Sequence, residues 1–311
     1  MITRCKWNAA TGLPPSAVQA FAQDGVLVIE DFVAAEGCAA LRERAEGLVQ
    51  QHAPKGEHTV FSTTDQSHAR NAYFEASANN IGVFFEEGAH DAQGQLTVPL
   101  AKAVNKIGHA MHDLDPVFDA FSRTADLANV ASSLGLLDPL LVQSMYIFKQ
   151  PGIGGEVNCH QDSTYLYTAP SSVIGFWFAI EDAHQGNGCL GGIAGSHTQG
   201  LRELFRRQTC GKDDGQLALE VLQPDLHWDT NSAEWLEVKQ GTLIVFNGLF
   251  AHLSAANRSA QSRHAYTLHA VSGKAHYPQS NWIQRQSVAG LTLRGFWSEL
   301  VHNEQRSIGQ R

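Results

Sequence analysis

The sequence is poor in cysteine, and its few cysteines follow neither a disulfide nor a metal-binding pattern. Its 311 residues include five, none in a Cys-x-x-Cys pair: Cys5, Cys38, Cys159, Cys189 and Cys210. An odd number without ligand spacing argues against a disulfide framework and against a cysteine-ligated zinc site. We therefore expect reduced thiols and a cytoplasmic location.

Long apolar runs are also missing. No stretch of about 18 apolar residues occurs, which disfavours a membrane-spanning helix. The first residues, "MITRCKWNAATGLPPSA", lack the apolar segment of a secretory signal peptide. Positive charge is scarce too, with 22 Lys plus Arg against 31 Asp plus Glu and a formal net charge of −9. Nucleic acid and membrane are therefore not expected partners, and no feature determines an oligomeric state.

The first part of the chain has a mostly helical pattern. A helix is expected over "PPSAVQAFAQDG", which begins with two prolines and ends at Gly25. A strand, "VLVIEDF" (26–32), and an amphipathic helix (34–51) follow. Residues 53–100 are predicted to be loops with one strand at "IGVFFEE", and two helical segments are expected at 101–112 and 116–134.

From residue 140 the pattern changes to short β-rich runs such as "LLVQSMYIFKQ", "VIGFWFAIED" and "GTLIVFNG". Turn residues separate them at close spacing, which is typical of an all-β sandwich or barrel. We predict one domain over 1–311 that is mainly β with flanking helices and has a jelly-roll or cupin-like core. It divides into a helical N-terminal part (1–139), the β core (140–275) and a C-terminal tail (276–311).

One β-rich run, "GGEVNCHQDSTYLYT", contains His160 and Asp162 two residues apart. Alternation along a strand would point both side chains to the same face, and Cys159 to the other. His252 follows the buried-looking strand "TLIVF" and is the best third ligand. Two histidines and one carboxylate form the facial triad of non-haem Fe(II) oxygenases. The alternative is that these are unrelated surface polar residues.

Arg263 lies eleven residues after His252, in "SRHAYTLH". An arginine on the next strand can reach into a barrel and hold a carboxylate through two parallel hydrogen bonds. A dicarboxylate co-substrate bound to the metal would need such a partner at its far end.

Several long blocks resemble the phytanoyl-CoA dioxygenase family, and within it most closely the domain-containing protein 1 subgroup. They are "NKIGHAMHDLDPVF", "VQSMYIFKQPGIGGEVNCHQDSTYLYT", "GFWFAIEDAHQGNGCL" and "GSHTQG", and the similarity runs from "FAQDGVLVIEDF" to "NWIQ". The resemblance implies a double-stranded β-helix and a dioxygenase that uses Fe(II), 2-oxoglutarate and O2 on a small or medium organic substrate. His160, Asp162 and His252 would then be the iron ligands, and Arg263 would bind the distal carboxylate of 2-oxoglutarate.

The same resemblance assigns four further residues to the co-substrate pocket: Lys106, Met145, Trp177 and Ser254. Core packing is the alternative for Met145 and Trp177, and a solvated surface charge is the alternative for Lys106. Succinate and carbon dioxide would be the co-products. Because related halogenases lack a carboxylate at the position of Asp162, hydroxylation or another oxidation is the expected outcome, rather than halogenation.

The substrate pocket is where the sequence departs from the family. Gly191 and Gly192 stand in "CLGGIAGSH", where relatives carry bulkier residues, so either the pocket wall is opened here or the strand has a bulge on its outer face. Arg202, with Arg206 and Arg207, could meet an anionic substrate such as a CoA thioester, or could form a solvated helix face. Two other functions remain open: an iron- and 2-oxoglutarate-binding sensor with little turnover, and a zinc hydrolase.

Overall fold

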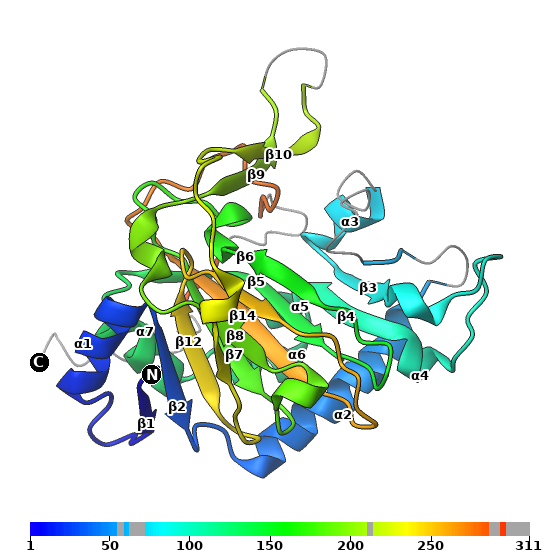
Figure 1. Cartoon of the computed structure of the whole chain (residues 1–311), viewed down its shortest axis with the longest axis horizontal. Helices are drawn as coiled ribbons and strands as arrows, with labels where there is room; N and C mark the ends of the chain where they lie inside the picture. Colours follow the sequence, from blue (N-terminus) through cyan, green and yellow to red (C-terminus); the bar gives the residue numbers. More distant parts are fainter. Residues whose placement is uncertain (55–58, 62–71, 210–213, 286–292, 297–311) are drawn as a thin grey trace, which may run out of the picture.

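The structure, a computed structural model, describes residues 1–54, 59–61, 72–209, 214–285 and 293–296. Two β-sheets dominate it, and helices lie on the outer side of the larger sheet (Figure 1). The helices are α1 (Pro15–Asp24), α2 (Ala35–His52), α3 (Ala72–Ser77), α4 (Leu100–Ala103), α5 (Met111–Leu114), α6 (Pro116–Ser122) and α7 (Ala125–Ser133).

Fourteen strands are present in the described residues. They are β1 (Arg4–Lys6), β2 (Val26–Glu30), β3 (Ile81–Phe85), β4 (Val104–His109), β5 (Pro139–Ile147), β6 (Val157–His160), β7 (Ile174–Ala179), β8 (Leu190–Gly192), β9 (Glu203–Arg207), β10 (Leu217–Val221), β11 (Glu234–Leu236), β12 (Leu243–Asn247), β13 (His252–Ser254) and β14 (Ala265–Ser272).

The strand order is that of a jelly roll. The eight-stranded sheet has the order β1-β2-β12-β7-β14-β5-β4-β3, the four-stranded sheet has the order β11-β8-β13-β6, and β9 and β10 form a separate ribbon. From β5 to β8 and again from β11 to β14 the chain moves between the two large layers. This arrangement confirms the predicted fold class, mainly β with a cupin-like double-stranded β-helix.

Period-two alternation explains why the central strands are apolar on both faces. In β12, Leu243 and Val245 pack in the apolar cluster shared with the helices, whereas Ile244 and Phe246 pack in the cluster between the two sheets. A strand buried on both faces is a continuous apolar run rather than an alternating one. The run "LIVF" therefore identifies a central strand of the sandwich.

The helix prediction at 101–112 is wrong, and the helical segment predicted at 116–134 is present but interrupted. Only Leu100–Ala103 and Met111–Leu114 are helical within or beside 101–112, and residues 104–109 form β4 between β3 and β5. The apolar side chains of Ala103, Val104 and Ile107 fit a helical period, but backbone pairing with two neighbouring strands overrides that local preference. The single helix expected at 116–134 is two helices, because Thr124 caps the start of α7.

The predicted boundary near residue 140 does not separate two parts of the structure. Strands β1 to β4 come from the N-terminal part but belong to the eight-stranded sheet. The helix at 15–24, the strand at 26–30 and the helix at 35–52 match their predictions closely, and α1 ends at Gly25 with a φ of 76°. No helix within the described residues is long and apolar enough to cross a membrane.

A buried ionic cluster attaches the C-terminal segment to the sheet. The Asp113 carboxylate is fully buried and lies 2.6 Å from Arg123 Nη2 and 3.0 Å from Arg294 Nη2. The Arg285 Nε atom lies 3.8 Å from the same carboxylate. Next to Arg294, Phe296 is 1% exposed. The described ends of the predicted tail are therefore packed parts of the fold.

We expect Asp113→Asn to lower the free energy of unfolding by about 3 kcal/mol, because the buried Arg123 and Arg285 would lose the fully buried carboxylate beside them. Urea unfolding monitored by circular dichroism measures this. The matched control is Asp119→Asn, since Asp119 pairs with the same Arg123 and Arg294 but is 35% exposed, and its loss should cost less than about 1 kcal/mol. Equal losses in both variants would contradict this account of the cluster.

Candidate functional site

The pairing of β6 with β13 brings the two predicted histidine ligands together. His160 and His252 are direct partners across these antiparallel strands, and their ring centroids are 4.3 Å apart. The register shifts immediately after His252, before Ser254. A shift of this kind re-aims side chains next to a site. Both imidazoles consequently lie at the same edge of the smaller sheet.

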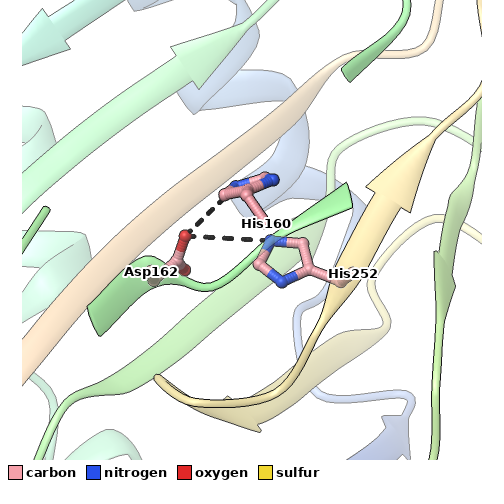
Figure 2. Close-up of side chains that lie close together, drawn as sticks. All are labelled: His160, Asp162 and His252. Carbon is pink, nitrogen blue, oxygen red and sulfur yellow. Dashed lines mark ion pairs between the residues drawn. The ribbon is translucent and has the colours of Figure 1, made fainter. Parts of the chain in front are cut away.

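Asp162 reaches the same point by a different route from the one predicted. Strand β6 ends at His160, and Asp162 begins a 3-10 turn (Asp162–Thr164), so strand alternation is not what aligns the two side chains. Figure 2 shows the three side chains converging, with Asp162 Oδ1 at 3.4 Å from His160 Nε2 and 3.8 Å from His252 Nε2. One ligand atom from each residue lies within 4.8 Å of the others.

Backbone carbonyls determine which imidazole nitrogens face this point. His160 Nδ1 lies 2.8 Å from the Asn158 carbonyl, and His252 Nδ1 lies 3.0 Å from the Phe250 carbonyl. A carbonyl oxygen can only accept a hydrogen bond, so each Nδ1 carries the proton. When the rings are neutral, the lone pair is on each Nε2, beside the carboxylate. This is the tautomer that a metal ligand needs.

His269 holds the outer oxygen of Asp162. Its Nε2 donates to Asp162 Oδ2 at 2.8 Å, and the ring is 2% exposed. Sequence reasoning missed this residue, although a pattern was available. Arg263, Thr267 and His269 all line the same cavity, because residues separated by two or four positions along a strand point to the same face. His269 therefore orients the carboxylate and leaves Oδ1 for a metal ion.

The protonation states favour a cation. Burial alone raises the pKa of Asp162, but His269, His252 and the hydrogen bonds from His160 and His269 outweigh it and hold the pKa well below its usual value. Burial, together with the neighbouring His160, lowers the pKa of His252 to about 4. Burial also acts to lower the pKa of His160, but the Asp162 carboxylate outweighs burial and raises it. The ionised Asp162, the neutral His252 and His160, once it has released its proton, form the donor set of a divalent metal.

The triad lies in a cavity of about 590 Å³ that also contains Arg263. Arg263 precedes β14 by two residues and is 2% exposed. Its Nε donates to the Gly188 carbonyl at 2.9 Å, its guanidinium lies 5.3 Å from the centre of the Trp177 ring, and its Nη1 has no hydrogen-bond partner. A buried guanidinium with an unused donor requires an acceptor, since leaving it unpaired costs free energy.

The four residues assigned to the co-substrate pocket all line this cavity. Lys106 is 7% exposed rather than solvated, and burial lowers its pKa to about 7. Its Nζ lies 3.9 Å from Met145 Sδ. Ser254 Oγ donates to the Gly188 carbonyl, which also accepts from Arg263. A second buried lysine, Lys149, was not predicted and also lines the cavity.

Gly191 and Gly192 do not belong to the cavity lining in the described residues. They lie on β8 between β11 and β13. A Cβ atom at Gly191 would lie 2.9 Å from the Trp235 ring, and one at Gly192 would lie 2.2 Å from the Phe250 ring. The expected opening of the pocket wall is not found here, because these two rings fill the space that a larger side chain would take.

Arg202 lines the cavity, but the helix considered for its segment does not form. Arg206 and Arg207 are in strand β9, and Arg202 immediately precedes it. Cys159 is half-buried and also lines the cavity, which differs from the buried position expected on the far face. Burial raises the pKa of its thiol to about 11, so it is protonated at neutral pH.

Metal affinity should fall with falling pH. A proton on His160 Nε2 occupies the lone pair that would bind a metal, and the pKa of this imidazole is raised. The metal affinity should therefore be highest above that pKa. Below it, the affinity should fall about tenfold per pH unit, because one proton competes with the metal. Anaerobic Fe(II) titration by calorimetry between about pH 6 and pH 8 measures this. Affinity that is constant over this range would contradict it.

His269→Ala should weaken metal binding about 10- to 100-fold, because Asp162 Oδ2 loses its hydrogen bond and the carboxylate can rotate. His269→Gln, whose amide can donate in the same direction, should restore most of the affinity. His227→Ala is the control, since His227 is an exposed histidine outside the cavity. If His269→Ala binds metal as tightly as the wild type, this orienting role is wrong.

Comparison with known proteins identifies the same family that the quoted sequence blocks resemble. The profile described as phytanoyl-CoA dioxygenase matches residues 21–265. A phytanoyl-CoA dioxygenase of Arabidopsis thaliana is 42% identical over 274 residues, covering 88% of this chain and 94% of that protein. Phytanoyl-CoA dioxygenase domain-containing protein 1 of Mus musculus is 40% identical over 279 residues, covering 88% of this chain and 95% of that protein.

Solved structures share the fold at much lower identity. The non-heme alpha-ketoglutarate-dependent carbocyclase SnoK has a TM-score of 0.61 at 14% identity, covering 93% of this chain and 97% of that chain. The epimerase SnoN, in complex with Fe³⁺, alpha-ketoglutarate and nogalamycin RO, has a TM-score of 0.59 at 13% identity, covering 91% of this chain and 95% of that chain. With the fold, the profile match and the relatives in agreement, the chain belongs to the phytanoyl-CoA dioxygenase family.

Proposed function

We propose that the protein is an Fe(II)- and 2-oxoglutarate-dependent dioxygenase that hydroxylates a small or medium organic molecule. The observation that carries the proposal is one cavity containing both a His-Asp-His donor set and a buried arginine with an unused donor group. Family membership and the named cofactors of SnoN and SnoK support the same chemistry.

His160, Asp162 and His252 would hold the iron through Nε2, Oδ1 and Nε2. Three protein ligands on one face leave positions for a co-substrate and oxygen. When bound, iron with 2-oxoglutarate and oxygen supplies the oxidation of a C–H bond, with succinate and carbon dioxide as co-products. The protein's own contribution is to position the reactants and to exclude water.

Arg263 would bind the distal carboxylate of 2-oxoglutarate. Its Nε is already used by the Gly188 carbonyl, which orients the guanidinium and leaves its Nη groups for a ligand. Trp177 covers one face of that guanidinium. Charge-assisted hydrogen bonds of this kind are stronger than neutral ones, particularly away from water. Lys106 and Lys149 line the same cavity and add positive charge that favours a dianion.

Asp162 also bears on the outcome of the reaction. Its Oδ1 faces both Nε2 atoms, so it occupies the position that a halide would need. This argues against halogenation, and hydroxylation is the oxidation that we propose. The zinc hydrolase alternative gives Arg263 no role in the cavity, and no observed contact favours it.

The test is succinate formation from 2-oxoglutarate with Fe(II), ascorbate and oxygen, with no added primary substrate. Wild type should form succinate slowly, His160→Ala should form none, and Arg263→Ala should need at least about tenfold more 2-oxoglutarate because it loses a charge-assisted pair. Arg258→Ala is a matched arginine control, since Arg258 is an exposed residue that does not line the cavity.

Two results would overturn the proposal. Stoichiometric iron and tight 2-oxoglutarate binding without any succinate would indicate a sensor. Failure of the wild type to bind iron and 2-oxoglutarate at all would exclude both functions. Metal content after anaerobic and aerobic purification separates iron from zinc.

A further inference from the structure

The cavity is chemically divided. Arg263 and Lys149 lie on the cationic side, where the proposed co-substrate would bind, and Lys106 lies between the two sides, with its Nζ 3.3 Å from the centre of the Phe61 ring. The other side is lined by members of a separate apolar cluster, among them Phe74, Leu166, Phe205 and Trp282. The triad adjoins the aromatic side, because the His160 and Tyr165 ring centroids are 6.3 Å apart.

Aromatic rings form much of the apolar side. Tyr165 lies 5.6 Å from Phe205 between ring centroids, and Phe74 stacks on Trp282 at 4.7 Å with an interplanar angle of 18°. These rings come from the turn after Asp162, from α3, from β9 and from the C-terminal segment. Ring faces and edges bind other rings in offset or T-shaped geometry. The hydroxyl of Tyr165 has no hydrogen-bond partner among the described residues, so a donor remains for a substrate carbonyl or ether.

Arg202 in the cavity lining, and Arg206 and Arg207 beside it on β9, each pair with a carboxylate. The pairs are Arg202–Glu203 at 3.0 Å, Arg206–Glu220 at 2.6 Å and Arg207–Glu75 at 2.7 Å. The lining also includes the exposed carboxylates of Glu87 and Glu156. Binding of phosphate groups requires arginine or lysine donors that are not already committed to carboxylates. Among the described residues, these pairs leave the aromatic side with little uncommitted positive charge for the phosphates of a CoA thioester, although Arg202 Nε is a buried donor without a partner there.

We propose that the primary substrate is an uncharged, ring-containing organic molecule that binds against Tyr165, Phe205 and Trp282, and that it is not an acyl-CoA. The inference rests on the proposed function, since it takes the cationic side to be occupied by 2-oxoglutarate. The ring-containing part presents a C–H bond to the metal from the Tyr165 side. A neutral acceptor group on the molecule meets the Tyr165 hydroxyl.

Equilibrium dialysis of protein loaded with Mn(II) and 2-oxoglutarate tests this without turnover. The probes are 2-acetylnaphthalene, which has two rings and one carbonyl, and octanoyl-CoA, which has an apolar chain and phosphates. We expect 2-acetylnaphthalene to bind at least tenfold more tightly than octanoyl-CoA, with little dependence on salt. Phe205→Leu and Tyr165→Leu each remove a ring but keep apolar volume, and should weaken its binding roughly three- to tenfold.

Val221→Ala is the control, since Val221 is an exposed apolar residue on β10 that does not line the cavity. Tighter, salt-sensitive binding of octanoyl-CoA that Arg206→Gln weakens would overturn the inference. So would a lack of 2-acetylnaphthalene binding, or equal binding by wild type and both ring variants. If Mn(II) and 2-oxoglutarate do not bind, the proposed function fails. Dialysis of 2-acetylnaphthalene against the unloaded protein then still tests the aromatic wall.

Discussion

The pairing of β6 with β13 is the constraint on which the site depends. It places His160 opposite His252, and both strands are short, four and three residues. β13 is also paired with β8 on its other side, so it cannot slide without breaking two ladders. A shift by one residue would turn His252 to the opposite face of the sheet. The sandwich around this pair therefore works as a support that keeps two imidazoles at a fixed separation.

Local hydrogen bonds then complete the donor set. The Asn158 and Phe250 carbonyls select the tautomers, and His269 orients Asp162 from the facing sheet. Each of these hydrogen bonds holds one of the three proposed ligand side chains against a backbone carbonyl or a side chain beside the cavity. The geometry is thus prepared before any ligand arrives, which reduces the ordering that binding requires.

Buried charge gives the cavity its polarity. Arg263, Lys106 and Lys149 are each less than one-tenth exposed. Burying cations without a full counter-charge is unfavourable, and burial lowers the pKa of both lysines to about 7. A bound dianion offsets this cost. The aromatic side has no such requirement, because its arginines already have carboxylate partners. In the proposed reaction, one cavity would hold a charged co-substrate beside an uncharged substrate.

The sequence alone was sufficient for the fold class and the family, because long motif blocks can be matched without knowledge of the fold. It also singled out His160, Asp162, His252 and Arg263, which the structure brings into one cavity. It was insufficient wherever a contact between distant residues decides the outcome. Residues 104–109 are a strand only because β3 and β5 flank them, and Asp162 meets the histidines through a turn rather than by alternation. The roles of His269 and of the C-terminal Trp282 depend on residues far away in the chain, with His269 and its partner Asp162 separated by 107 positions. Local sequence patterns indicate secondary-structure propensity and periodicity. Contacts between residues far apart in the chain form only once the two sheets have packed.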